Sequence, residues 1–399
     1  MSKSILLFCS NPYEGGTAKI FVEIVNGLNL RIKDKNIYAA IDENNKVKQY
    51  NEIQSTFFKI NVINKEQYFK KTNNEHNILY KIIRNIIHSI IYYPTYKKNI
   101  LQFETILKSK SIDCVMVHSG GYHADNLCLQ LLEAAKRKNI KNRIMVFHND
   151  FEKQSKLEKL YYYLYDKKVM NTTSQIVVVS NFMKSRLERT SYLKNIQVIY
   201  NGISKIVEEE KQKKYERLGI NNSKFIIGMI GNFEIRKGHI YLLEAINKLK
   251  NKKDITVIII GNVYDKVYYD ICLDYIHRNN MEEIINVKSG IKDAGKFTEC
   301  FDVMVFPSIE DESFGIVALE AMMFKVPVIS FNCGGIPEVI QNNITGFVLN
   351  IMDSDALAEK IDMLINNEDL RIKLGENGKR VLEEKFTLDK MINNYSNII

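Results

Sequence analysis

The sequence predicts an α/β protein built from two doubly wound domains in tandem, and two observations lead to this fold class. Strand-like apolar runs rich in β-branched residues alternate with amphipathic helical patterns, which indicates parallel sheets covered on both faces. At 399 residues, the chain is also too long for one ordinary core. It therefore divides most simply into two Rossmann-like domains of roughly 200 residues each.

Four strands are predicted in each half of the chain. The first series is Ile5–Cys9, Cys114–Val117, Ile144–Phe147 and Ile176–Val179, and the second is Phe225–Ile230, Thr256–Ile260, Val303–Phe306 and Val326–Ser330. The alternation is interrupted near Asn201 and Gly202, ahead of the charged stretch 208–217. We therefore expect a first domain at residues 1–203 and a second at residues 204–385.

Polar and glycine-rich turns follow these strands in both halves. Ligands of open α/β sheets bind outside the carboxyl ends of the strands, so a cleft between two such edges is the expected active site. The residues at these positions are Asn11 to Gly16, His118, His148, Ser180, Gly231, Asn232, Gly261, Asn262, Pro307 and Ser308.

Composition and charge indicate a globular protein of the cytoplasm. Hydrophobic content is 45% and charged content 26%, as in folded domains. The six cysteines show no metal-type spacing, and no secretory signal or membrane-spanning run is visible.

Residues 1–203 carry 31 Lys and Arg against 17 Asp and Glu, a net charge of +14, whereas the rest carries −5. This basic half favours an anionic membrane or a phosphorylated substrate over nucleic acid, because no nucleic-acid-binding motif is present.

A basic amphipathic helix is predicted within residues 78–98. Apolar pairs recur every four residues from Ile78 to Ile91, with Lys81, Arg84 and His88 between them. Such a helix either packs on the first sheet or lies on an anionic membrane surface. The second interpretation would make the protein peripheral on the inner face of the cell membrane.

One carboxylate in the second domain needs an explanation. The run from Ile316 to Phe324 is apolar on every side, which predicts a buried helix, yet Glu320 lies in its middle. A buried charge costs several kcal/mol, roughly, unless a partner compensates for it. Because the stretch has no basic residue before Lys325, we interpret Glu320 as a contact for a hydroxyl-rich ligand. Glu312 precedes it on the loop ahead of the helix.

These residues carry a family resemblance. The stretch from Phe225 to Phe347 resembles the donor-binding half of family 4 glycosyltransferases of the group 1 type, which are retaining enzymes with the GT-B fold. The shared features are a diphosphate-type loop at 231–238, the pair Glu312 and Glu320 of an E-x₇-E motif, Pro327-Val328, Gly334-Gly335, Glu338 and Gly346. The first half is similar more loosely, at Glu14-Gly15-Gly16, His148, Ser180 and Asn201-Gly202. The resemblance also implies that the tail 386–399 crosses back to the first domain.

The resemblance assigns roles in the second domain. Glu320 would hold the nucleotide ribose and Glu312 the donor sugar, although Glu312 could also be one more acid in a solvated run. Lys237 would neutralise the departing diphosphate. The helix N-terminus formed by Ser313, Phe314, Gly315 and Ile316 would bind phosphate through its free amides.

The chain departs from the family at one position of the diphosphate loop. An arginine usually follows the glycine, and this chain has Asn232 there. Arg236, beside Lys237, is a candidate for the second cation, although side chains of neighbouring residues often point apart. The departure predicts a change in diphosphate affinity or in the range of donors.

Further candidates come from the first domain. The resemblance places His148 against the donor sugar as a catalytic residue, and Gly15 and Gly16 in a tight turn against the diphosphate. His118 and His123 are candidates for the acceptor side or are structural.

We expect neither a metal nor a cofactor. Asp353-Ser354-Asp355 has the spacing of a metal-binding DxD motif, but it lies just before a helical pattern and is interpreted as an N-cap with a first-turn acid. The resemblance implies that cationic side chains and helix dipoles stabilise the leaving group instead.

The implied function is transfer of a sugar from a nucleoside-diphosphate sugar to an acceptor hydroxyl with retention of configuration. A lipid-linked or glycan acceptor in capsule, exopolysaccharide or cell-wall synthesis fits the basic first domain. Two alternatives remain, namely another GT-B enzyme such as a sugar-nucleotide epimerase, and a non-catalytic partner subunit of a glycosyltransferase. The sequence does not identify the base, the sugar, the acceptor or the oligomeric state.

Overall fold

The computed structural model describes residues 4–11, 15–43, 45, 47–62, 78–121, 126–149, 159–191, 193–204, 210–220 and 224–399, with side chains omitted at 78–90, 159–162 and 190. Contacts divide this chain into two compact units. The first comprises residues up to Val179, Met183–Ile199 and Ile392–Ile399, and the second comprises Ser180–Phe182 and Tyr200–Met391.

The described part of the first unit contains a parallel, seven-stranded sheet in the order β3-β2-β1-β4-β5-β6-β7. Its strands are β1 (Ser4–Cys9), β2 (Asn36–Asp42), β3 (Thr56–Ile60), β4 (Ile112–Ser119), β5 (Asn142–Phe147), β6 (Gln175–Val178) and β7 (Ile196–Val198). The strand β1 is buried along its whole length, as expected for a central strand covered on both faces.

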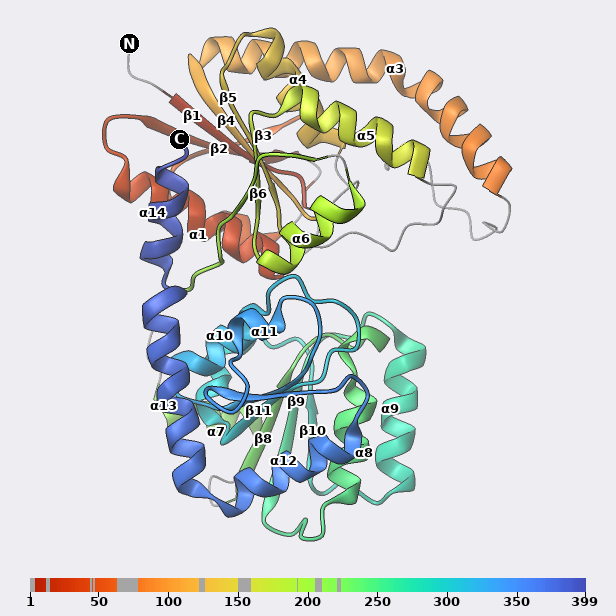
Figure 1. Cartoon of the computed structure of the whole chain (residues 1–399), viewed down its shortest axis with the longest axis vertical. Helices are drawn as coiled ribbons and strands as arrows, with labels where there is room; N and C mark the ends of the chain where they lie inside the picture. The colour runs from red at the N-terminus through yellow and green to blue at the C-terminus, as the bar shows by residue number, and fades with distance from the viewer. Residues whose placement is uncertain are drawn as a thin grey trace. The chain divides into compact units, whose positions relative to one another are not determined.

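Helices connect these strands. They are α1 (Gly16–Arg31), α3 (Ile78–Ser109), α4 (Asn126–Arg137), α5 (Lys159–Thr172) and α6 (Asn181–Thr190), with a 3₁₀ turn η1 (Lys48–Glu52). Figure 1 shows α4 packed between α3 and α5. The helix predicted at 78–98 is therefore the first part of α3. None of the described helices is both long and apolar enough to cross a membrane.

The second unit contains a parallel, six-stranded sheet over its described residues, in the order β10-β9-β8-β11-β12-β13. The strands are β8 (Phe225–Ile230), β9 (Ile255–Ile260), β10 (Ile285–Lys288), β11 (Val303–Phe306), β12 (Val328–Phe331) and β13 (Gly346–Leu349). In both sheets the strand order reverses beside the first strand of the unit, so the prediction of two doubly wound folds is confirmed.

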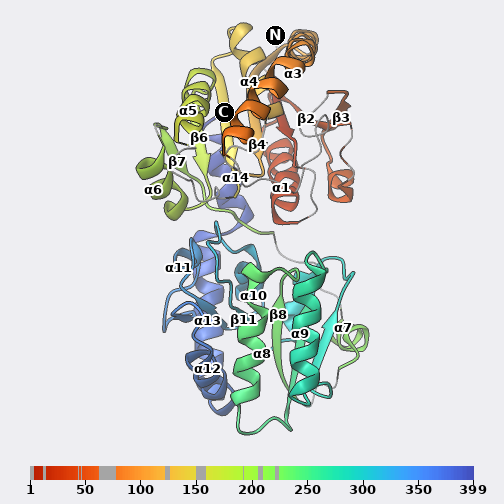
Figure 2. The ribbon, with the colours of Figure 1, turned by 90° about the vertical axis from the view of Figure 1, so that its right-hand side faces the viewer.

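The helices of the second unit cover both faces of its sheet. They are α7 (Lys211–Leu218), α8 (His239–Lys248), α9 (Lys266–Arg278), α10 (Ile316–Met323), α11 (Ile336–Val339), α12 (Ser354–Asn366) and α13 (Glu368–Lys385), with 3₁₀ turns η2 (Ile235–Lys237) and η3 (Ala294–Cys300). The helix α14 (Leu388–Ser396) begins in the second unit and continues into the segment Ile392–Ile399 of the first. Figure 2 shows α8 and α9 side by side in front of β8.

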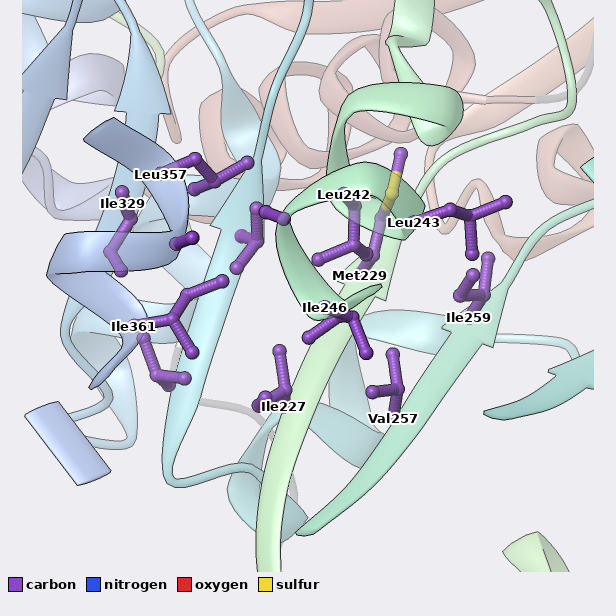
Figure 3. Packing of buried hydrophobic residues seen from close by; sticks show 14 of the residues in the cluster. Ile227, Met229, Leu242, Leu243, Ile246, Val257, Ile259, Ile329, Leu357 and Ile361 are labelled. Atoms are coloured by element: carbon purple, nitrogen blue, oxygen red, sulfur yellow. The ribbon is translucent and has the colours of Figure 1, made fainter. Parts of the chain in front are cut away.

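The core of the second unit lies between this sheet and the helices α8 and α12. Ile227 and Met229 of β8, Leu242 and Ile246 of α8, and Ile361 of α12 interlock in one buried cluster (Figure 3). Each such side chain contributes roughly 1.5–3 kcal/mol when it is buried. This packing fixes the carboxyl ends of β8 and β11, from which the candidate site is built.

Candidate functional site

The loop after β8 is held against the loop after β11. Gly238 has a φ of 72°, and a Cβ there would lie 2.0 Å from the carbonyl oxygen of Pro307. The N–H of Ile309 donates to the carbonyl of Arg236 at 2.9 Å. A glycine is required for both the conformation and the close approach, and the result is a fixed backbone at Arg236 and Lys237.

Three side chains converge on one oxygen of Glu312. Its Oε1 accepts from Lys237 Nζ, from the Arg236 guanidinium at 3.1 Å and from Ser308 Oγ at 2.9 Å. Arg236 and Lys237 therefore point to the same place, although they are neighbours in the sequence. The pair Glu234–Arg236 is joined by two further hydrogen bonds of 2.9 and 3.3 Å.

Charge pairing favours the ionised forms of Glu312 and Arg236. Burial acts to raise the pKa of Glu312, but Lys237 and Arg236 outweigh it and the pKa is lowered. Burial likewise opposes the charge of Arg236, whereas Glu312 and Glu234 raise its pKa. The Glu312 side chain is only 13% exposed, so it is a buried, paired carboxylate and not a member of a solvated acidic run.

The backbone of Glu312 is fixed from the other side by the turn after β12. The Gly335 N–H donates to the Glu312 carbonyl at 2.7 Å. Gly334 has a φ of 59°, and a Cβ there would lie 2.2 Å from the same carbonyl oxygen. The paired glycines of the sequence motif thus serve to hold the Glu312 loop.

The residues predicted to form a phosphate-binding helix end lie at the start of α10. Gly315 is its N-cap with a φ of 96°, and Ile316 is its first residue. Ser313 is buried, and the Phe314 ring packs against Tyr200 and Phe386, with centroid distances of 5.7 and 5.6 Å. The Phe314 side chain is therefore structural, and what this segment offers a ligand is its backbone.

Glu320 lies in a separate cluster from Glu312. It is buried in the middle of α10, and its carboxyl group lies over Gly295 of η3, where a Cβ would approach it to 2.2 Å. Glu320 is not without a partner in the protein. Its burial therefore does not require a ligand, and its contact with ribose stays a prediction.

Asn232 connects the ends of neighbouring strands. Its Oδ1 accepts the Asn262 N–H at 3.1 Å, and Asn262 Oδ1 accepts the Gly290 N–H at 3.1 Å. These bonds join the loops after β8, β9 and β10. Asn232 brings no charge to the loop, so its positive charge comes from Arg236 and Lys237.

In the first unit, His118 and His148 form a buried pair. His118 Nδ1 and His148 Nε2 are 2.9 Å apart and the rings stack, with an interplanar angle of 19°. Burial lowers the pKa of His148 to about 4. Burial and the neighbouring His148 lower the pKa of His118 well below its ordinary value. Within the described part of the chain, His148 Nδ1 is buried without a hydrogen-bond partner. Its contact with a sugar stays a prediction.

The remaining candidates of the first unit lie near the start of α1. Gly15 has a φ of 145° and donates its N–H to Gln49 Oε1 at 3.1 Å, and Gly16 opens the helix. A Cβ on Gly15 would meet nothing within 4 Å, so conformation and not space requires this glycine. His123 lies outside the described residues.

The interpretation of Asp353 as a helix cap is confirmed. Its side chain accepts the Ala356 N–H at 2.8 Å at the start of α12, and Asp355 pairs with Lys248 at 2.8 Å. Among the described residues, no three His, Cys, Asp or Glu side chains gather as metal ligands would. The absence of a metal from the reaction remains an expectation.

Two contributors to the site were not predicted from the sequence. Glu234 bonds to Arg236 of the charged cluster, and the buried His239 ring lies 3.2 Å from the Gly231 carbonyl and stacks on Phe233. Ser308 was predicted only as a polar position after β11, and the structure adds its hydrogen bond to Glu312. The contacts of Glu234 and His239 depend on the conformation of the loop and have no sequence signal.

Comparison with known proteins identifies the family. The model for glycosyl transferases group 1 matches residues 210–381, and the model for Glycosyltransferase Family 4 matches residues 68–205. Between them they match most of the chain, which belongs to the family 4 glycosyltransferases of the group 1 type. Both family models are those of glycosyltransferases, which are transferases of sugars, enzyme class EC 2.4.

The relatives and solved structures agree with this family. The capsular polysaccharide biosynthesis glycosyltransferase CapM of Staphylococcus aureus is 30% identical over 236 residues, which span 56% of this chain and 61% of CapM. A glycosyltransferase from Rickettsia africae superimposes with a TM-score of 0.79 at 23% identity, covering 100% of this chain and 97% of that one. The structure of Anabaena HepE in complex with UDP superimposes with a TM-score of 0.76 at 17% identity, covering 99% of this chain and 98% of that one. The predicted GT-B fold is confirmed.

Proposed function

We propose that this protein transfers a sugar from a nucleoside-diphosphate sugar to an acceptor hydroxyl with retention of anomeric configuration. The observation that carries the proposal is the convergence of Lys237 and Arg236 on Glu312. Two cations fixed at the carboxyl end of a parallel sheet suit the charge that develops on a departing diphosphate. HepE, which has the same fold, binds UDP and UDP-glucose.

Each residue has a role in this proposal. Lys237 and Arg236 neutralise the diphosphate, and the backbone amides at Phe314 to Ile316 bind its oxygens. Glu320 holds the ribose, and Glu312 holds the hydroxyls of the donor sugar. His148 supports the sugar from the first unit. Neither a metal nor a cofactor takes part, because the cations supply the electrostatic stabilisation of the leaving group.

The acceptor is proposed to be a lipid-linked or other glycan of bacterial capsule, exopolysaccharide or cell-wall synthesis, and the protein is proposed to be cytoplasmic. The name of CapM and the net positive charge of the first 203 residues support this choice.

The protein is further proposed to be peripheral on the membrane through α3. Ile91, Tyr93 and Leu101 of this helix are exposed, and Lys97 lies 4.7 Å from the Tyr93 ring centroid. Apolar and basic side chains on one exposed helix suit an anionic lipid surface. We expect the protein to sediment with anionic vesicles at low salt and to be released by salt. Failure to sediment under these conditions would exclude this attachment.

A donor screen tests the proposed function. A bound donor stabilises the folded state, so thermal unfolding in the presence of UDP-, GDP-, dTDP- and ADP-sugars should show a raised melting temperature for one base. No shift with any of the four would contradict the proposal. Incubating the stabilising donor without acceptor then separates the alternatives, because an epimerase would yield a new sugar nucleotide and a non-catalytic subunit would yield no product even with acceptor.

A further inference from the structure

The position of Glu234 is unexpected for a phosphate-binding loop. Its carboxylate lies two residues before Arg236 and three before Lys237, and a carboxylate near a diphosphate repels it. Yet Glu234 is 27% exposed and has both oxygens engaged by one guanidinium. Its Oε2 accepts from Arg236 Nε at 2.9 Å and its Oε1 from Arg236 NH2 at 3.3 Å.

This two-point contact fixes the direction of the Arg236 side chain. A planar guanidinium held by two parallel hydrogen bonds keeps a single orientation, and here its remaining terminal nitrogen points at Glu312 Oε1, 3.1 Å away. The Arg236 side chain is 37% exposed. Without Glu234 it would have freedom to turn into solvent, which is entropically favourable for arginine.

The loop after β8 has a second feature that makes the orientation of the Arg236 side chain important for binding a diphosphate. Asn232, at the end of β8, carries no charge, and its carbonyl oxygen already accepts the Asn262 N–H. Within the described part of the loop after β8, Arg236 and Lys237 are therefore the cations that converge on Glu312. If Arg236 turned away, Lys237 would be left alone there.

We propose that Glu234 is a positioning residue: its two hydrogen bonds to Arg236 hold that guanidinium beside Lys237, where it serves as the second cation for the diphosphate of the donor. The inference rests on the proposed function. It makes Glu234 and Arg236 one unit in binding, although only Arg236 would touch the ligand.

The test is a set of Glu234→Gln, Arg236→Ala and double variants, with UDP, GDP, dTDP and ADP titrated into each by calorimetry. Electrostatics alone predicts that removal of the Glu234 charge tightens binding of the nucleotide. The positioning role predicts the opposite sign, a weakening of about 3–10-fold, with Arg236→Ala weakening it at least as much. The double variant should bind the nucleotide no more weakly than Arg236→Ala does, because the effects of two residues that act through one another do not add.

Two controls complete the design. Glu310→Gln removes a nearby exposed acid whose side chain makes no hydrogen bond to Arg236, so it should leave binding unchanged or slightly tighter. Asn232→Arg, added to Glu234→Gln, should restore part of the lost affinity by supplying a cation from another position. Urea denaturation checks that the variants remain folded.

The outcomes separate the two proposals. Tighter or unchanged binding in Glu234→Gln, with Arg236→Ala weakened, would overturn the positioning role and leave the proposed function standing. Full additivity in the double variant would also overturn it. Binding of none of the four nucleoside diphosphates to the unaltered protein would contradict this donor class, and the inference would fall with it.

Discussion

At the scale of single residues, the charged cluster shows how a carboxylate is kept buried and ionised. Glu312 is stabilised by a lysine, an arginine and a hydroxyl on one oxygen. A buried acid without such partners would take up a proton. The placement of these side chains depends on Gly238 and Gly334, where the backbone passes close to a neighbouring loop. The effect of replacing such a glycine on the free energy of unfolding can be measured.

Replacement of Gly238 by alanine should destabilise the fold strongly. The left-handed conformation costs an alanine about 1–2 kcal/mol, and the new Cβ would clash with the Pro307 carbonyl at 2.0 Å. Gly290 is a matched control, because its φ of 71° is similar and nothing lies within 4 Å of its Cβ position. In urea denaturation we expect a loss of about 3 kcal/mol or more for Gly238→Ala and about 1–2 kcal/mol for Gly290→Ala. Equal losses would show that the contact between the loops is unimportant.

At the level of elements, the strands with a continuous apolar run were predicted, whereas the edge strands and the interior strand β2 were not. Runs such as 225–230 and 255–260 are continuously apolar, which is typical of central parallel strands. The strands β10 (Ile285–Lys288) and β13 (Gly346–Leu349) have four residues each and include a polar residue or a glycine. Their pairing with β9 and β12 is set by the surrounding fold and not by their own sequences.

The caps of helices were predictable, because the side chain that makes the cap is local to the helix. Asp353→Ala should lose about 1 kcal/mol of unfolding free energy through the lost hydrogen bond to the Ala356 N–H. Asp355→Ala, two residues further on, removes an 85% exposed side chain with one surface ion pair, and should cost less than about 0.5 kcal/mol. Urea denaturation of both variants measures the difference, and the reverse order would contradict the assignment of the cap.

For the whole molecule, the reaction class could be predicted from the spacing of the motifs along the sequence. The contacts between side chains within the site could not. The order of the loop 231–238, Glu312 and Glu320 pointed to the family. Arg236 lies beside Lys237 with its guanidinium bonded to Glu234, and the Glu320 carboxyl group lies over Gly295 of η3. Both are results of tertiary contact, which a linear pattern does not contain.

Global stability should fall in mild acid because of buried histidines. The pKa of His148 is lowered to about 4 by burial, and that of His118 lies well below the ordinary value. As pH falls from about 6.5 toward 4, the unfolded chain takes up protons that the folded chain does not. The unfolding free energy should therefore decrease, by up to about 1.4 kcal/mol per pH unit for each histidine.

Urea denaturation of His148→Asn between pH 7.5 and 4.5 measures this contribution. The variant should have a shallower dependence on pH than the unaltered protein. An equally steep slope in His148→Asn would contradict the account of the buried pair.

Release of nucleoside diphosphate in the presence of acceptor measures whether Lys237 and Glu312 act on a nucleoside-diphosphate sugar. With the donor that stabilises the protein most, Lys237→Ala and Glu312→Ala should each lower the rate about 10²–10³-fold while the fold stays intact. Lys253→Ala and Glu310→Ala, at exposed positions, should retain the rate of the unaltered protein. Near-normal release by both Lys237→Ala and Glu312→Ala would contradict the assignment.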